Sequence, residues 1–497
     1  MCITQGICAK IIVKKAMLDI HAISLIYGGD IGGSKNMSKT SGTDLNLTVG
    51  SPFKLILVFA IPMILGNLLQ QLYNFVDTII VGRYLGVEAL AGVGATSSIN
   101  FLILGFCMGM CAGFAIPVAQ MYGAGDYEKL RKYVANTLYL SLAFSVVITV
   151  VVCVFCRNIL VLMNTPENVF EYSYIYILTI FIGIPITFLY NILAGIIRAI
   201  GDSKTPLLFL IISTIINLGL DILFISQYGM GVFGAALATV LAQLISGILC
   251  LLLVVKKFTI LHVKGKEWAV DFKLMGRLCL MGLPMGLQYS ITAIGSVILQ
   301  TSVNGLGAIA VAATTSASKV NMLFICFLDA LGASMATYAG QNLGAGKIDR
   351  IRKGGGASVI IGFAYCVIAF VAVLFVRRPL INLFLDEPVE EMIELSSLHV
   401  LITIASLVLL VLVNCLRFMI QGAGYSFLAI IAGVLEMIAR AVAGVFFIPK
   451  WGFIGACVAS PFAWLLADCF LVPAFFLVVH RLEKKLKANK ATVEQEG

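Results

Sequence analysis

The sequence predicts an all-α integral membrane protein in which twelve transmembrane helices form two pseudo-symmetric six-helix lobes. The first observation is composition, because 60% of the residues are hydrophobic, 12% are charged and the mean hydropathy is +1.02. Soluble domains carry about 25% charged residues. The second observation is that apolar residues recur as long uncharged runs from end to end, and the third is an internal repeat. A transmembrane barrel would show short alternating segments instead.

Helix-length apolar runs follow one another along the chain, each bounded by charged or Gly/Pro-rich breaks. A spanning helix needs about 20 mainly apolar residues, and we expect twelve such spans. They lie near residues 55–81, 92–120, 133–156, 169–197, 206–226, 232–255, 276–301, 308–339, 355–376, 392–420, 426–448 and 453–480. The longest polar connection, residues 256–277, falls in the middle and divides the chain into two halves.

These boundaries predict five segments. They are an N-terminal tail over residues 1–50, a first lobe of helices 1–6 over 51–255, a cytoplasmic linker over 256–275, a second lobe of helices 7–12 over 276–480, and a basic tail over 481–497. We expect the N-terminal tail to be disordered, because its apolar stretch is too short and broken to span a membrane. Met37 begins a short polar stretch that leads into the first span, and we hypothesise that it is the natural start.

The two halves repeat each other in register. Gln120–Lys132 (QMYGAGDYEKLRK) matches Gln341–Lys353 (QNLGAGKIDRIRK), and the offset between matching landmarks stays nearly constant along the chain. Since each half holds an even number of spans, the copies have the same orientation and form a parallel repeat. The Gly-Ala-Gly triplets in these segments lack the Lys-Ser/Thr of a phosphate-binding loop, so we expect them to act as turns.

Basic residues gather in the loops on one side of the predicted membrane. This side carries Lys129, Arg131, Lys132, Arg198, Lys204 and the basic residues of 256–277, 347–353 and 481–490, whereas the other carries Arg83, Arg157, Arg377, Arg378 and Lys450. The positive-inside tendency therefore predicts that both termini are cytoplasmic and that the chain crosses the inner or plasma membrane many times. The net charge of +9 follows this loop pattern, so we expect contact with the lipid bilayer and none with nucleic acid.

Few polar side chains lie inside the spans, and the first half holds a set that favours cation chemistry. Asp77 lies inside the first span, where a carboxylate costs about 2.5–3.5 kcal/mol even on the mildest scale. Asn217 and Asp221 are four residues apart, so they share one face of the fifth span. Thr239 lies in the sixth span. Oxygen ligands of this kind suit a proton or a small hard cation. The alternatives are interhelical hydrogen bonding for Asn217 and Thr239 and, for Asp77 and Asp221, a place near a helix end where the carboxylate reaches the membrane interface.

The second half also carries charged residues in its spans, but their spacing does not by itself indicate a site. Glu436 and Arg440 are four residues apart, and we expect them to neutralise each other on one helix face. Lys319, Arg417 and Asp468 also lie in predicted spans. We keep five secondary site candidates. They are Asn191, Gln288, Asp329, Glu436 and Arg440.

No enzyme signature accompanies these residues. The four histidines are far apart, and the sequence contains no HExxH, GxSxG or phosphate-loop motif. Eleven of the 13 cysteines are scattered through apolar spans, which is typical of small apolar residues at helix interfaces. We therefore expect no catalytic residue and no cofactor apart from a coupling ion. A channel would be expected to show a re-entrant filter segment, and none is evident.

Five motifs stand in a characteristic order along the chain: FVDTIIVGRYLG, AQMYGAGD, GDSKTP, NLGLDILFI and GQNLGAG. On these motifs the chain resembles the multidrug and toxic compound extrusion (MATE) transporters over residues Ser51 to about Arg481. The Asn-x-x-x-Asp spacing in the fifth span is similar to that of the DinF-like branch. The resemblance implies the MATE/MOP-type fold, with two lobes around a central cleft that opens to alternate faces.

The resemblance also implies function and site residues. Antiport of amphipathic, often cationic drugs against H⁺ or Na⁺ is implied, with a cation site in the first lobe and a bending proline at Pro62. The implied cation ligands are Asp77, Asn217, Asp221 and Thr239. The acids that NorM-like members carry in helices seven and ten have no match near Thr292 and Leu412, so coupling is expected in the first lobe. The alternative is a flippase for lipid-linked oligosaccharides or lipids, which would favour a more cationic cavity. We expect a monomer.

Overall fold

Helices make up the whole regular structure of the described residues. The computed structural model describes residues 45–384 and 389–496, with side chains up to residue 488, and this part of the chain contains no strand. Residues 1–44 of the predicted tail and the proposed start at Met37 lie outside it.

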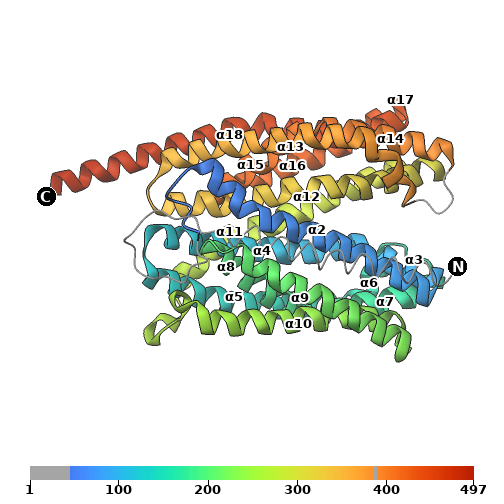
Figure 1. Ribbon diagram of the computed structural model, residues 1–497, viewed down its shortest axis with the longest axis horizontal. Helices are drawn as coiled ribbons and strands as arrows, with labels where there is room; N and C mark the ends of the chain where they lie inside the picture. The colour runs from blue at the N-terminus through green and yellow to red at the C-terminus, as the bar shows by residue number, and fades with distance from the viewer. Residues whose placement is uncertain (1–44, 385–388, 497) are drawn as a thin grey trace. The chain divides into compact units, whose positions relative to one another are not determined.

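The helices carry the labels of Figure 1. In the first half they are α2 Pro52–Leu85, α3 Val87–Ala95, α4 Ser97–Ala124, α5 Tyr127–Val154, α6 Cys156–Leu162, α7 Glu167–Ile182, α8 Ile184–Ala199, α9 Lys204–Asp221, η1 Ile222–Gln227 and α10 Gly231–Lys257. The connection between the halves contains η2 Thr259–Leu261 and η3 Gly265–Trp268. In the second half they are α11 Phe272–Asn304, α12 Ala308–Gly344, α13 Ile348–Asn382, α14 Glu390–Ala405, α15 Leu407–Gly422, α16 Ser426–Val442, η4 Ala443–Phe447, α17 Ile448–Trp451 and α18 Phe453–Glu496.

The number of spans agrees with the sequence prediction. Among the described residues, 10 helices are long and apolar enough to cross a membrane, and the number rises to 12 when each of two bent helix pairs counts as one span. Helices suit this environment because hydrocarbon offers no water to backbone N–H and C=O groups, which must bond within the segment. The chain is a multi-pass membrane protein, and the predicted all-α fold class of twelve spans is confirmed.

Two spans that the sequence predicts as continuous are bent. The axes of α7 and α8 differ by 48° across Gly183, and those of α14 and α15 differ by 47° across Ser406, at the matching position of the repeat. Pro185 explains the first bend, because it cannot donate a backbone hydrogen bond. In the second, the Ser406 hydroxyl donates to the Ile402 carbonyl at 2.8 Å, a local bond of the kind that bends helices. The repeat therefore keeps a bend that different residues produce.

A π-helical turn occurs at the matching position of both halves. The segment η1 follows α9 directly after Asp221, and η4 follows α16 directly after Val442. Such turns are rare and are frequently found at functional sites. In the first half, the turn begins next to one of the predicted cation ligands.

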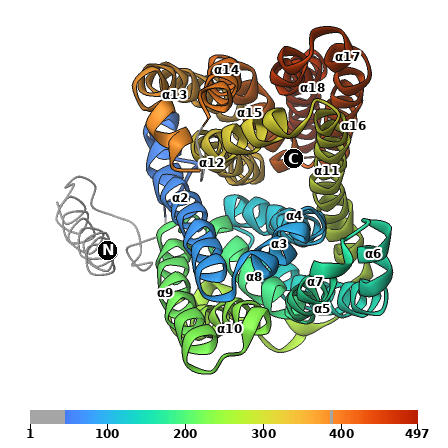
Figure 2. The same ribbon diagram turned by 90° about the vertical axis from the view of Figure 1, so that its right-hand side faces the viewer.

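The first helix of each half contacts both halves. Early in α2, Asn67 donates from Nδ2 to the Cys326 carbonyl of α12 at 3.2 Å. Late in α2, Ile80 packs with residues of η1 and α10. Likewise α11 begins against α4, where Gly282 lies on Phe114, and continues against α16. Figure 2 shows α2 running from beside α12 and α13 to beside α9 and α10.

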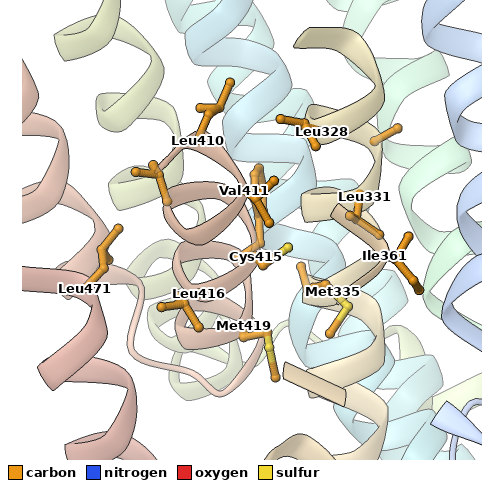
Figure 3. Packing of buried hydrophobic residues seen from close by; sticks show 14 of the residues in the cluster. Leu328, Leu331, Met335, Ile361, Leu410, Val411, Cys415, Leu416, Met419 and Leu471 are labelled. Atoms are coloured by element: carbon orange, nitrogen blue, oxygen red, sulfur yellow. The ribbon is translucent and has the colours of Figure 1, made fainter. Parts of the chain in front are cut away.

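The buried core of the second half is apolar and closely packed. Side chains from α12, α13, α15 and α18 interdigitate around Met335, Val411 and Cys415 (Figure 3). The same cluster includes Phe59 and Ile64 of α2, which are 1% and 8% exposed. The start of α2 is therefore part of the second half's core. The sequence assigns α2 to the first lobe, which is predicted to begin at residue 51, and that boundary stays a prediction. The start of α2 nevertheless packs with side chains of the second half.

The connection between the halves is docked on α5. Arg131 donates from Nε and Nη2 to the two carboxylate oxygens of Glu267 at 2.7 and 2.6 Å, and the Lys264 amide donates to Glu267 Oε2 at 2.8 Å. The Tyr139 hydroxyl donates to the Trp268 carbonyl at 3.0 Å. The bonds that Glu267 accepts, those from Arg131 first and then that from the Lys264 amide, lower its pKa from the ordinary 4.5 to about 2. The linker therefore fastens the start of α11 to the first half.

This geometry predicts a pH-dependent attachment of the linker. Because the pKa of Glu267 is lowered on docking, its contribution is complete above about pH 4.5 and is lost as the pH falls towards 2. We expect Glu267→Gln to speed hydrogen exchange of the Lys264 amide at pH 6, and the variant and wild type to converge near pH 2. Hydrogen-exchange mass spectrometry of the 258–271 peptide at matched pH measures this.

Glu128→Gln is the matched control, because the carboxylate of Glu128 pairs with Lys132 on an exposed surface. It should leave exchange of the linker peptide unchanged. Equal exchange of Glu267→Gln and wild type at pH 6 would contradict the docking role.

Candidate functional site

Two helices bring three of the four predicted cation ligands to one cavity. The cavity, of about 110 Å³, lies between α2 and α9 and is lined by Asp77, Asn217 and Asp221. Tyr73 also lines it, one helical turn before Asp77. Two pairs spaced four residues apart thus face each other, Tyr73 with Asp77 on α2 and Asn217 with Asp221 on α9. The rest of the lining is Leu69, Leu72, Val76, Thr214 and Leu218.

Thr239 of α10 lies outside the cavity lining and positions two side chains that belong to it, those of Tyr73 and Asn217. Its Oγ1 lies 3.1 Å from the Tyr73 hydroxyl and 3.4 Å from Asn217 Nδ2. The Thr239 hydroxyl donates its own hydrogen to the Ala235 carbonyl at 3.2 Å. Because that hydrogen is used, the Tyr73 hydroxyl and the Asn217 amide both act as donors to Thr239. Thr239 therefore fixes the orientation of the Asn217 amide through its nitrogen.

Four buried oxygens at this cavity receive no hydrogen bond from the described residues. They are Asp77 Oδ1, Asn217 Oδ1 and both carboxylate oxygens of Asp221. Asn217 is 2% exposed and Asp221 is 1% exposed. The carboxyls of Asp77 and Asp221 lie close enough to hydrogen-bond each other once one of them is protonated.

Donor-free oxygens beside two carboxylates fit a small cation. Buried polar groups are nearly always paired, and leaving a charged one unpaired is costly. A proton on one acid lets the two carboxyls bond to each other, and carboxylate and amide oxygens are also ligands that a monovalent hard cation prefers. Among the described residues, no three His, Cys, Asp or Glu side chains form a group able to hold a metal ion, so the site has two acids and not the larger set of a divalent site.

The remaining first-half candidates lie outside the cavity lining. Pro62 is a buried residue of α2, in the part that packs on the second half. Asn191 of α8 donates from Nδ2 to the Thr187 carbonyl of its own helix at 2.8 Å. Thr187 in turn donates to Gln243 Oε1 of α10 at 2.8 Å. Asn191 therefore takes part in the internal bonding of the bent span.

The second-half candidates form a separate buried polar network. Glu436 accepts from Arg417 of α15 through Oε1 and from Arg440 Nη2 through Oε2, the latter at 3.4 Å. All three side chains are less than a tenth exposed. The predicted Glu436–Arg440 pair is thus part of a triad whose third member, Arg417, comes from a neighbouring helix.

Four more polar side chains lie in the same half. Asp329 Oδ1 accepts from Asn414 Nδ2 at 2.9 Å, and Gln288 Oε1 accepts from Gln421 Nε2 at 2.5 Å. Most of the second-half candidates are therefore partnered by protein groups, in contrast to Asp77, Asn217 and Asp221.

Sequence reasoning missed three residues that the structure makes prominent. Tyr73 lies one turn from Asp77 on the same helix face, and that spacing could have identified it. Gln120 and Gln341 are the first residues of the two repeated segments, and their occurrence at matching positions could have identified them. Each donates from Nε2 to a carbonyl of the other half, Gly422 at 3.0 Å and Ala199 at 2.9 Å.

The sequence profile of the MatE family matches residues 62–223 and 284–446, one stretch in each half. The chain is 30% identical over 348 residues to the probable multidrug resistance protein YpnP of Bacillus subtilis, covering 69% of this chain and 77% of that protein. It is 29% identical over 359 residues to the probable multidrug resistance protein YoeA of the same organism, covering 71% and 77%.

A solved structure has the same fold. The outward-facing conformation of a multidrug resistance MATE family transporter of the MOP superfamily superimposes with a TM-score of 0.83 at 24% identity. The match covers 90% of this chain and all of the other.

The buried triad generates a stability prediction. Glu436→Gln leaves Arg417 and Arg440 without their shared carboxylate, and breaking a buried ion pair costs about 3–5 kcal/mol. We expect a clear loss of thermal stability in detergent, measured by the midpoint of unfolding. Replacing all three residues by Met should recover part of it, because the two guanidiniums are then no longer buried without the carboxylate of Glu436.

Glu394→Gln provides the comparison, since the carboxylate of Glu394 pairs with Arg378 at an exposed position. It should change stability by less than about 1 kcal/mol. Equal melting of Glu436→Gln and Glu394→Gln would show that the triad does not hold the second half together.

Proposed function

The chain belongs to the MatE family, the MATE transporters, and from this premise we propose that it exports amphipathic, often cationic compounds in exchange for H⁺ or Na⁺. The multidrug resistance names of YpnP and YoeA support the substrate class. The DinF-like branch, suggested by the spacing of Asn217 and Asp221, belongs to the same proposal. Neither a catalytic residue nor a cofactor other than the coupling ion has a part in it.

The observation that carries the coupling proposal is the set of donor-free oxygens around the α2–α9 cavity. Two carboxylates held apart from water are destabilising until a cation reaches them. An ion that binds one conformation better than another shifts the protein towards that conformation. We propose that H⁺ or Na⁺ at Asp77 and Asp221 favours the outward-facing state and weakens substrate binding there, which makes the two bindings mutually linked.

The chain's own residues have distinct roles in this scheme. Asp77 and Asp221 supply the charge that the cation neutralises, and Asn217 adds a neutral oxygen. Thr239 and Tyr73 fix the orientation of these groups from the back of the cavity. Pro62 removes a backbone hydrogen bond from α2, so the helix can bend where it passes from the second-half core towards the cavity.

Orientation and assembly complete the proposal. The loop charges favour cytoplasmic termini, which assigns residues 45–50, 120–126 and 341–350 to the cytoplasmic face of a cell membrane. We propose a monomer in the lipid bilayer. A lipid flippase is the less favoured alternative, because a lipid phosphate favours a cationic cavity, whereas the α2–α9 cavity is lined by the acids Asp77 and Asp221.

Efflux measurements test the coupling site. In cells that express equal membrane levels, we expect wild type to export dye under an imposed proton gradient or an imposed sodium gradient, and Asp77→Asn to lose gradient-driven export. The gradient that drives wild type identifies the ion. Asp329→Asn is the matched control, because it neutralises a membrane-embedded acid of the second half and should keep gradient dependence. Export by Asp77→Asn at the wild-type rate would refute the assignment.

Cation affinity tests the positioning role of Thr239. Thr239→Val keeps the shape but removes the acceptor for Tyr73 and Asn217. Loss of an outer partner of this kind weakens ion binding about 10–100-fold, and we expect a shift of that size in ²²Na⁺ binding or in a proton-release titration of purified protein. Thr214→Val alters another cavity-lining hydroxyl, which bonds to its own helix, and should shift affinity far less.

A further inference from the structure

Two glycines, one from each repeat, allow the halves to meet backbone to backbone. A Cβ on Gly123 would lie 1.9 Å from the Gln341 carbonyl oxygen, and one on Gly344 would lie 1.8 Å from the Gln120 carbonyl oxygen. Gly123 lies in the last turn of α4 and Gly344 ends α12, and the two occupy matching positions of the repeat. The sequence predicts only turns here. Gly125 and Gly346, the last glycines of the Gly-Ala-Gly triplets, do have the positive φ of a turn. Gly123 and Gly344, the first glycines of the triplets, instead lie against the backbone of the other half.

The glutamines three residues before these glycines make reciprocal bonds across the same contact. Gln120 Nε2 donates to the carbonyl of Gly422, the last residue of α15, at 3.0 Å. Gln341 Nε2 donates to the carbonyl of Ala199, the last residue of α8, at 2.9 Å. Each side chain satisfies a carbonyl that a helix end leaves free. The two donors match each other in the repeat, and so do the two acceptors, so the arrangement follows the internal symmetry of the chain.

Residues 45–50 fasten this contact from outside. The Leu45 amide donates to the Gly201 carbonyl of the first half at 3.3 Å, and the Leu47 amide donates to Gln341 Oε1 of the second half at 3.1 Å. Arg350 donates to the Leu47 and Gly50 carbonyls at 3.2 and 2.8 Å. This segment lies within the predicted tail, yet Leu47 is fully buried.

The turns at the other end of the spans lack such contacts. Gly86, Gly229, Gly231, Gly307 and Gly452 lie in these turns, and an added Cβ at any of them meets no atom within 4 Å. Close backbone contact of glycines across the repeat therefore occurs at Gly123 and Gly344, and within the spans at Gly109 and Gly113, but not at the turn glycines of this other end.

We propose that the two Gln-x-x-Gly segments, Gln120–Gly123 and Gln341–Gly344, form the cytoplasmic gate of the transport cycle, with residues 45–50 as its fastening strap. The gate is closed in this structure. It rests on the proposed alternating access, because a substrate can enter from the cytoplasm only after both reciprocal bonds and both glycine contacts separate. Since the contact is symmetric, a change in either repeat should open it to a similar extent.

Glycine variants provide the test in the full-length protein, without substrate or ion gradient. Gly123→Ala and Gly344→Ala each place a methyl group where a backbone oxygen lies. We expect both to increase hydrogen exchange about tenfold in the peptides covering residues 45–50, 120–126 and 341–347. Gly356→Ala is the matched control, because Gly356 is an exposed helical glycine with no atom within 4 Å of an added Cβ.

A second readout separates a gate from a structural contact. In alternating access, opening one end closes the other, so peptides covering residues 86–90, 228–232 and 305–310 should exchange more slowly in both variants. Faster or unchanged exchange there, or an effect confined to the mutated repeat, would overturn the proposal. If the alanine variants do not fold, Gln120→Leu and Gln341→Leu decide by the same criteria, because they remove the bonds without adding a clash. The exchange measurements need no substrate, so a wild-type protein that exports no drug would contradict the proposed function without changing the exchange results.

Discussion

The absence of water from a hydrocarbon layer governs this structure more than any other constraint. Each polar group within a span must find its partner inside the protein. Serine and threonine side chains do so by bonding to carbonyls of their own helix, as Thr214, Ser334 and Ser406 do. Against this background, the donor-free oxygens of Asp77, Asn217 and Asp221 are informative, because they cluster in one cavity. The same constraint that shapes the scaffold therefore marks the candidate site.

The two halves share one arrangement of helices but place different charged side chains at matching positions. Gly295 occupies the position of the repeat that matches Tyr73, and Arg440 Nη1 lies 3.4 Å from the Cβ position of that glycine. Leu299 correspondingly stands where the first half has Asp77. The second half thus places the guanidinium of Arg440, which shares Glu436 with Arg417, where the first half has a tyrosine beside the cavity of Asp77 and Asp221.

The crossing helices relate these sites to movement of the halves. Because α2 begins in the second-half core and lines the cavity of Asp77 and Asp221 further along, any displacement of one half must act on this helix. The helix α11 has the reciprocal path, and the docked linker attaches its start to α5. Each of these two helices carries an internal proline, Pro62 or Pro284, where a missing backbone bond lowers the resistance to bending.

The sequence alone was sufficient for the membrane class, the number of spans and the repeat, because hydropathy and register depend on local order along the chain. It also singled out Asp77, Asn217 and Asp221, since an acid or amide inside an apolar run is costly wherever the helix packs. Helix packing alone decided that Thr239 stands behind the cavity, that Arg417 joins Glu436 and Arg440, and that Gln120 and Gln341 bond across the repeat. Those contacts join residues as many as 302 positions apart, and no local spacing carries that information.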